Sequence, residues 1–165
     1  REALEYNGPV YLRFGRAAVP VINDRPDYHF EMGKGIRLRD GKDVSIFATG
    51  ILVSAAIDAA EKLAADGISA DVIDIHTIKP LDRELVIESA KKTGLVVTAE
   101  EHSVIGGLGG AVCECLSEEC PTKVCRIGVK DRFGESGKAS ELIKIFGFDG
   151  DGVYKTVKEF VQKNK

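Results

Sequence analysis

A strand-helix-strand unit at residues 71–110 constrains the fold of this chain more than any other feature of its sequence. Residues 71–75 form a short run of mainly β-branched apolar side chains, which favours a β-strand. Pro80 separates this run from the next element, because proline has no N–H group to donate to a sheet. A second apolar run at residues 95–99 predicts another strand, with a helical segment between the two. This order predicts an α/β fold with a mostly parallel sheet.

The helix between the two strands carries start and stop signals. Asp82 is a favourable N-cap residue, and Gly94 can take the left-handed conformation that ends a helix. Lys91 and Lys92 fall in the last turn, where positive charge complements the helix dipole. The second strand delivers residues 100–110 to the carboxyl end of the sheet, where open α/β sheets bind ligands and partners.

The rest of the chain continues the alternation of strands and helices. Residues 40–43 have the composition of a hairpin turn, so we expect the strands on either side of it to pair antiparallel. We predict a three-layer α/β/α sandwich with a mixed, mostly parallel sheet of about five strands, the first of them antiparallel. The other expected strands are at residues 36–38, 44–49 and 123–129, and the other expected helices are at 52–65, 109–118, 139–146 and 150–163.

Residues 1–30 differ in composition from the rest of the chain. An apolar run at residues 9–14 predicts a strand, and residues 16–30 combine prolines and charges without a sustained period, as interdomain linkers do. We expect residues 1–30 to be the tail of a preceding domain with its linker, and residues 31–165 to form the α/β domain. The first residue is Arg1 rather than Met, so we expect a piece of a longer polypeptide or a processed chain.

Charge and hydropathy exclude several classes of function. The net charge is -3 and the basic residues are scattered, whereas nucleic-acid binding needs Lys and Arg concentrated on one face. The sequence has no run of about 18 apolar residues and no charged-then-apolar leader, so we expect neither a membrane span nor a signal peptide. With 44% hydrophobic and 30% charged residues, the composition is typical of a soluble α/β domain, and we expect a cytoplasmic protein.

The four cysteines crowd into one short stretch, at Cys113, Cys115, Cys120 and Cys125. Their C-x-C-x4-C-x4-C spacing matches no common zinc or iron-sulfur pattern, and the first two lie about 200° apart around the expected helix. We therefore expect no metal site. The favoured interpretation is small buried apolar side chains in a reducing compartment.

Residues 106–110 (GGLGG) are rich in glycine at the start of an expected helix. They do not complete a G-x-G-x-x-G dinucleotide motif, because Val112 stands where the third glycine is required. We interpret the glycines as positions of close backbone approach. The free N–H groups of the helix start could still take an anion or a partner's carboxylate.

Glu100, Glu101 and His102 follow the buried strand, at the place where an acid or base group would be positioned. The alternative interpretation is that they make hydrogen bonds at an interface or behind another site. No nucleophile accompanies them, and His29 and His76 are interpreted as loop histidines. From its residues alone, the chain presents a scaffold without a complete catalytic set.

Three motifs resemble the C-terminal domain of transketolase and of its thiamine-diphosphate relatives. The resemblance runs from about Gly8 to the end of the chain, and residues 11–16 (YLRFGR) resemble the last strand of the pyrimidine-binding domain that comes before it in that family. The motifs are IKPLDR at residues 78–83, VTAEEH at 97–102 with GGLG at 106–109, and SGK at 136–138 with ELIKIFG at 141–147.

The resemblance implies a role in a larger enzyme. The family moves a two-carbon ketol unit from a ketose phosphate to an aldose phosphate, as in the pentose phosphate pathway, with thiamine diphosphate and Mg²⁺ supplying the difficult chemistry. Its diphosphate motif, metal ligands and activating glutamate lie in earlier domains. The implied role of this segment is therefore to support the fold and a homodimer beside the cofactor-binding domains or subunit, with no cofactor bound and no catalytic residue of its own.

Arg16 is the one site residue that the resemblance assigns. The arginine at this position in the family helps to anchor the phosphate of the sugar substrate, although Gly15 stands where some members have Ser. Two alternatives remain open. The same domain ends deoxyxylulose-phosphate synthase and the β subunit of 2-oxoacid dehydrogenases, and the chain could instead be a free-standing α/β binding or assembly module without enzyme activity.

Overall fold

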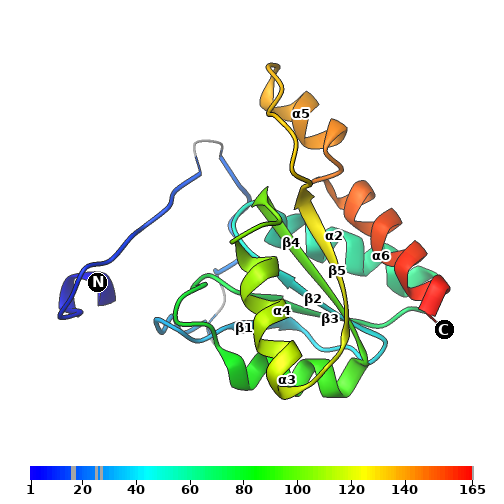
Figure 1. Cartoon of the computed structure of the whole chain (residues 1–165). Helices are drawn as coiled ribbons and strands as arrows, with labels where there is room; N and C mark the ends of the chain where they lie inside the picture. The colour runs from blue at the N-terminus through cyan, green and yellow to red at the C-terminus, as the bar shows by residue number, and fades with distance from the viewer. Residues whose placement is uncertain (16–17, 25, 27, 165) are drawn as a thin grey trace.

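The computed structural model describes residues 1–15, 18–24, 26 and 28–164. Its centre is a five-stranded sheet in the order β1-β3-β2-β4-β5, shown in Figure 1. The strands are β1 (Ile36–Arg39), β2 (Val44–Ala48), β3 (Ala70–Asp74), β4 (Leu95–Ser103) and β5 (Lys123–Val129). The helices are α1 (Glu2–Glu5), α2 (Leu52–Ala65), α3 (Arg83–Thr93), α4 (Leu108–Glu119), α5 (Ala139–Ile145) and α6 (Gly150–Asn164).

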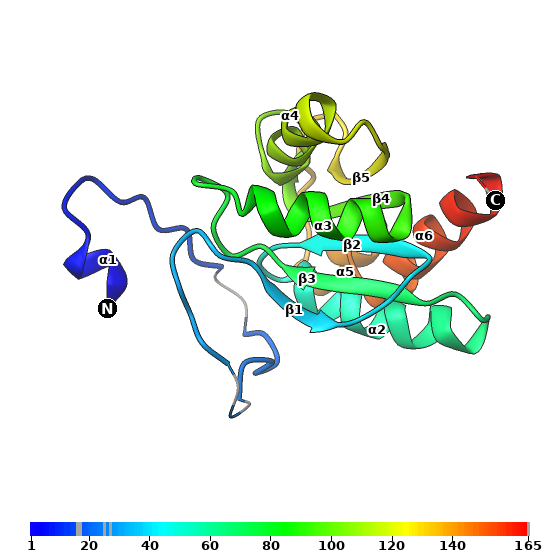
Figure 2. The ribbon, with the colours of Figure 1, turned by 90° about the horizontal axis from the view of Figure 1, so that it is seen from below.

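Helices cover both faces of the sheet, so the predicted three-layer sandwich is confirmed. One apolar cluster joins the sheet to α2 and α6, and a second joins it to α3 and α4 on the opposite face. Figure 2 shows these two pairs of helices on opposite sides of the sheet. Strand β3 illustrates how the sequence builds both clusters. Val72 faces α2, whereas Ile73 and Ile75 face α3 and α4, because successive side chains of a strand point to opposite faces.

The first strand is antiparallel to the others, as predicted, but the expected hairpin is wrong. Strand β1 pairs with β3, with Ile36 opposite Asp74, and β3 lies between β1 and β2. The turn at residues 40–43 wraps around the start of β3, where the backbone N–H of Lys42 donates to the carbonyl oxygen of Ser69. A Cβ atom at Gly41 would lie 2.1 Å from the carbonyl carbon of Ala70, so only glycine fits this crossing.

The predicted boundaries of α3 are confirmed by its caps. The backbone N–H of Leu85 donates to Asp82 Oδ1 over 3.2 Å, and Gly94 ends the helix at φ 70° in the left-handed region. Asp82 Oδ2 also accepts from the backbone N–H of Gly35 at 3.0 Å. One carboxylate therefore starts the helix and ties it to the segment that leads into β1.

The described part of residues 1–30, which we refer to as the N-terminal segment, lies outside the sheet. Residues 9–14, expected to form a strand, pair with no described strand, and α1 is the only helix among residues 1–15. Tyr11 and Phe14 are 88% and 83% exposed, and Figure 1 shows α1 and the chain that directly follows it standing to one side of the sandwich. Among the described residues, no helix has the length and apolar character needed to cross a membrane.

Candidate functional site

Glu100 binds the start of helix α4. The structure extends β4 beyond the predicted end at residue 99 to Ser103, and places the Glu100 side chain 1% exposed beneath the helix. Its Oε2 accepts from the backbone N–H of Leu108 at 2.8 Å, and its Oε1 accepts from that of Gly109 at 2.7 Å. The free N–H groups at this helix start therefore bind a carboxylate of the same chain.

Close backbone approach, predicted for the glycine-rich turn, is confirmed at Gly107 and Gly109. A Cβ atom at Gly107 would lie 2.0 Å from Glu100 Oε2, and one at Gly109 would lie 2.9 Å from Thr98 Oγ1. Gly110 faces open space instead. The carboxylate of Glu100 can reach the helix because Gly107 has no side chain, and the missing side chain at Gly109 lets the helix approach Thr98.

Glu101 and His102 lie apart from Glu100 on the exposed rim of the sheet. Arg13 Nη2 donates to the carbonyl oxygen of Glu101 at 3.3 Å and lies 3.9 Å from Glu101 Oε2. The nearest polar partner of His102 Nδ1 is the carbonyl oxygen of Ser103, at 3.3 Å. The three neighbours in sequence therefore do not form an acid-base pair. Glu100 caps a helix, and Glu101 contacts the N-terminal segment.

That contact brings Arg13 of the N-terminal segment to the switch point of the sheet. The chain leaves β2 toward β3 and leaves β4 toward β5 on the opposite side, which creates the crevice where doubly wound sheets bind ligands. Arg13 contacts the end of β4, and a Cβ atom at Gly15 would lie 3.8 Å from Ile51, just after β2. Arg13 and Gly15 thus contact the chain on both sides of this crevice.

Arg16, the expected substrate-binding residue, lies outside the described residues and stays a prediction. The other histidines are distributed as loop residues. His29 is exposed, and the ring of His76 packs on Phe30 with 4.2 Å between centroids. Burial lowers the pKa of His76 despite the opposing charge of Glu2, which favours the neutral imidazole.

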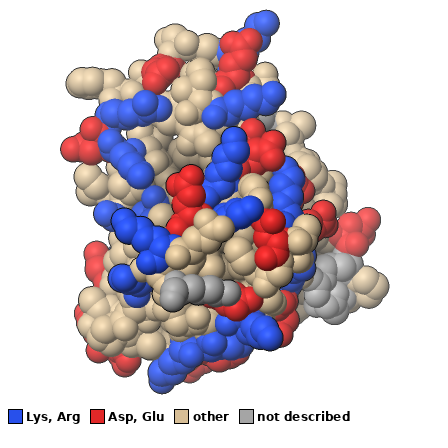
Figure 3. Space-filling model, turned by 90° about the vertical axis from the view of Figure 1, so that its right-hand side faces the viewer, with Lys and Arg blue, Asp and Glu red and all other residues tan. Residues whose placement is uncertain are grey.

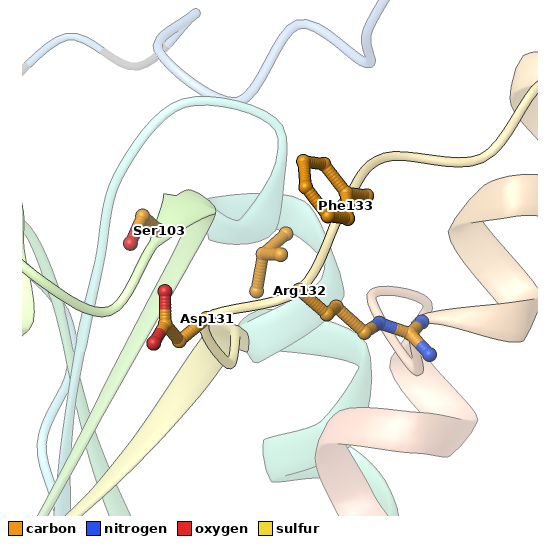
Figure 4. Close-up of a pocket in the computed structure, with 5 residues that line it drawn as sticks. Ser103, Asp131, Arg132 and Phe133 are labelled. Atoms are coloured by element: carbon orange, nitrogen blue, oxygen red, sulfur yellow. The ribbon is translucent and has the colours of Figure 1, made fainter.

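Two cavities open at the carboxyl edge of the sheet. The smaller, of about 260 Å³, is lined by Ser103, Val129, Asp131, Arg132 and Phe133. Figure 4 shows the Arg132 side chain directed away from Ser103 and Asp131. Its guanidinium carbon lies 4.2 Å from the centre of the Phe146 ring, so this cavity offers a ligand few convergent polar groups. The larger cavity, of about 470 Å³, lies between the N-terminal segment, the start of α2 and the end of β3.

The cysteines lie on both faces of the sheet. Cys115 and Cys120 pack with the α3/α4 cluster, whereas Cys125 packs with the α2/α6 cluster. Burial raises the pKa of the Cys113, Cys115 and Cys125 thiols, which disfavours the reactive thiolate. The sheet therefore separates these thiols and prevents all four from binding a single ion.

The helix start at Gly107 does not fit a diphosphate group, because the Glu100 carboxylate fills it and would repel an anion. Within the described ranges, no three His, Cys, Asp or Glu side chains are grouped so that they could hold a metal ion. The face seen in Figure 3 carries basic and acidic side chains interspersed. Absence of cofactor binding by this chain stays a prediction.

Comparison with known proteins gives matches over most of the chain. The family model described as "Transketolase, C-terminal domain" matches residues 33–153. A 6-deoxy-6-sulfo-D-fructose transketolase subunit of Clostridium sp. (strain MSTE9) is 47% identical over 98% of this chain and 50% of that protein. A protein of Methanocaldococcus jannaschii named as a transketolase C-terminal section is 46% identical over 99% of this chain and 51% of that protein.

More distant and structural matches agree with these. 1-Deoxy-D-xylulose-5-phosphate synthase 1 of Geobacter sulfurreducens is 39% identical over 98% of this chain but only 26% of its own length. A solved structure titled "Split gene transketolase, inactive beta4 tetramer" has a TM-score of 0.91 and 50% identity, covering 98% of this chain and 52% of that one. The chain thus spans about half the length of the curated relatives it matches first.

Proposed function

Because the chain belongs to the transketolase family, as a C-terminal segment, we propose that it completes a transketolase whose cofactor-binding part lies elsewhere. The assembled enzyme would transfer a two-carbon ketol unit from a ketose phosphate to an aldose phosphate with thiamine diphosphate and Mg²⁺. The observation that carries the proposal is the similarity to transketolase subunits and sections over nearly the whole of this chain and about half of each relative. The names of two relatives specify sulfofructose and apulose 4-phosphate, so the sugar could also be an uncommon one.

The chain's own polar groups support a structural role in that enzyme. The carboxylate of Glu100 is committed to the start of α4, and Glu101 contacts Arg13 of the N-terminal segment. A complete catalytic set would therefore have to come from another part of the enzyme. We propose that this segment supports the fold and the subunit contacts and is inactive alone.

We propose that residues 1–30 are the tail of a pyrimidine-binding domain and its linker, and that residues 31–165 are the C-terminal domain. The extended, exposed run with Tyr11, Leu12 and Phe14 supports this division. Exposed apolar side chains on an unpaired extended segment are suited to joining a sheet supplied by other parts of the enzyme. Arg16, at the end of this run, would then stand at the mouth of the active site and bind the substrate phosphate.

The proposed partners are the cofactor-binding domains or subunit of the same enzyme and a second copy in a homodimer. The split-gene neighbour is titled an inactive β4 tetramer, which supports assembly through the part of the enzyme that this chain resembles. By analogy with the family, the enzyme would act in the cytoplasm and in the pentose phosphate pathway.

Deoxyxylulose-phosphate synthase is the second candidate, because its C-terminal region is 39% identical to nearly the whole chain. The transketolase subunits are more similar, at 46–47%, and match in about half of their length instead of a quarter. Both differences favour a transketolase. The two reactions differ in the donor, since the synthase decarboxylates pyruvate and a transketolase cleaves a ketose phosphate.

The deciding experiment combines the full polypeptide, or this chain and its complementary subunit, with thiamine diphosphate, Mg²⁺ and an aldose phosphate. Consumption of a ketose phosphate donor is expected in the assembled enzyme and not with this chain alone. Calorimetric titration of the chain alone should show no magnesium-dependent cofactor binding at micromolar concentration. Turnover of pyruvate in place of the ketose phosphate would favour the synthase, and turnover by the isolated chain would contradict the proposal.

A further inference from the structure

We propose that the larger cavity binds a small molecule with a cationic, donor-rich headgroup, a primary ammonium or a guanidinium, on an apolar body. We refer to it as the Asp74 cleft. It is bounded by the N-terminal segment, the first turn of α2 and the end of β3. The residues that carry the argument are Phe14, Val21, Ile51, Ser54, Asp74 and His76.

The central observation is a buried carboxylate that has no partner in the part of the chain that the structure describes. Asp74 is the last residue of β3 and shares the α2 side of the strand with Val72. Its side chain lines the cleft and is only 6% exposed, yet no residue that the structure describes forms a hydrogen bond or ion pair with it. Burial alone raises the pKa of Asp74 to about 6. Buried carboxylates are normally paired, so this one is suited to an external donor.

A second polar atom without a partner among the described residues belongs to His76, which also lines the cleft. His76 follows Asp74 by two positions, and its Nδ1 lies 2.8 Å from the hydroxyl of Thr77. Its Nε2 is buried and has no hydrogen-bond partner among the described residues. With Nδ1–H donating to Thr77, Nε2 presents a lone pair. Two residues that line the cleft thus each carry an acceptor without a described partner, and a headgroup with several N–H donors suits this pair.

The walls and size of the cleft suit a small amphipathic molecule. Phe14, Val21 and Ile51 give it apolar sides, and its volume of about 470 Å³ falls in the range of small-molecule sites. No Lys or Arg is among the described residues that line it. Among the described residues of the cleft, then, nothing neutralises the negative charge of Asp74, and a cation complements it.

An anion at the first turn of α2 is the competing occupant, because helix starts attract negative charge. Two observations disfavour it. The backbone N–H of Val53 already donates to the carbonyl oxygen of Gly50, and ionised Asp74 repels an anion in the same cleft. The Ser54 hydroxyl is also committed, since it donates to the carbonyl oxygen of Ile51.

The test uses the full chain and four probes with short unbranched alkyl chains: n-butylammonium, n-butylguanidinium, neutral n-butanol and anionic n-butanoate. Carboxyl ¹³C resonances of the aspartates are followed by NMR at pH 7.5. The two cations should shift the Asp74 resonance at millimolar concentration and bind roughly tenfold or more tightly than n-butanol, as a charge-assisted hydrogen bond requires. They should also lower the pKa of Asp74 toward the ordinary range.

Two variants and a pH series test whether the Asp74 carboxylate itself binds the cation. Asp74→Asn should weaken cation binding about tenfold or more, whereas Asp131→Asn, an exposed residue of the smaller cavity, should leave it unchanged. Cation binding should weaken as the pH falls through about 6, where Asp74 gains its proton. His76 lines the same cleft, and the charge of Tyr28 is coupled to Asp74, so both resonances are followed in parallel.

Three results would each overturn the proposal. The first is n-butanol binding with the same affinity as the cations, and the second is unchanged cation affinity in Asp74→Asn. The third is an Asp74 resonance that does not move in the wild-type chain at about 50 mM cation, a concentration far above the dissociation constant expected for such small ligands. The last measurement needs no variant, so it decides the matter even if Asp74→Asn is poorly folded. None of the measurements depends on ketol transfer, so the proposed function and this site can fail separately.

Discussion

Glu100 Oε1 lies 2.7 Å from the backbone nitrogen of Gly109, so a side chain at the end of β4 closes the first turn of α4. The bond spans nine positions of sequence and is fully buried. It joins the strand, the glycine-rich turn and the helix into one rigid corner. The orientation of the exposed residues that follow Glu100 depends on this corner.

Removing the carboxylate should destabilise the fold. Glu100→Ala leaves the N–H groups of Leu108 and Gly109 buried and unpaired, which should cost about 2–4 kcal/mol of unfolding free energy. Glu100→Gln keeps an acceptor and should lose less. Urea denaturation measures the unfolding free energy of both variants. Glu101→Ala is the matched control, and its exposed contacts should contribute less than about 1 kcal/mol. Equal losses for the two alanine variants would contradict the capping role.

Two substitutions in the glycine-rich turn should change the stability of the chain in opposite directions. Gly107→Ala places a methyl group 2.0 Å from Glu100 Oε2 and should destabilise the chain by about 2 kcal/mol or more, by overpacking and loss of the cap. Gly110→Ala meets open space inside α4 and should stabilise it by about 0.5–1 kcal/mol, since alanine loses less conformational freedom than glycine. Melting temperatures of the two variants should therefore move in opposite directions. A tolerated Gly107→Ala would show that the turn can relax.

Asp74 should make stability fall as the pH rises from about 4 to about 6. Its folded-state pKa of about 6 exceeds the unfolded value near 4, so the folded chain holds the proton longer and the ionised form is penalised above that window. Asp74→Asn should therefore stabilise the chain by up to about 3 kcal/mol at pH 7 and by less than about 1 kcal/mol at pH 4. Urea titrations at both pH values measure the difference. A gain independent of pH would assign the effect to packing instead of charge.

Arg16 should matter for phosphorylated substrates in the assembled enzyme. A charge-assisted contact with the substrate phosphate is worth about 1.5–3 kcal/mol, so Arg16→Ala should lower kcat/KM by roughly tenfold to a hundredfold without affecting cofactor binding. The loss should shrink for donors without a phosphate. Parallel kinetics on both kinds of donor, with a melting curve for each variant, measure this. Equal losses on the two donors would rule out the anchor.

The sequence predicted most helices and strands well, because caps and apolar runs are set by residues within the element or next to it. The cap at Asp82 and the stop at Gly94 fixed α3, and the apolar runs located the buried strands. The pairing of β1 could not be read in the same way. A turn composition at residues 40–43 is compatible with a hairpin, and only the crossing of Gly41 over Ala70 shows that β3 lies between the two strands.

The candidate site was predicted in position but not in role. Glu100 stood out as a polar residue after a buried strand, yet its function depends on a helix start that lies eight to nine residues later. A glutamate followed at that spacing by a glycine-rich turn is a signal that could have suggested the cap. No sequence signal marks Asp74 and His76 as acceptors without a described hydrogen-bond partner, because their surroundings depend on how the N-terminal segment packs beside the end of β3.

The antiparallel strand β1 also shields one edge of the sheet from other molecules. Strand β3 is buried along its whole length, and without β1 it would be an open edge on which another molecule could extend the sheet. Strand β1 is a poor template for such growth. It has four residues, it carries Arg37 and Arg39, and its register with β3 shifts between these two arginines. The strand therefore protects the chain against edge-to-edge aggregation.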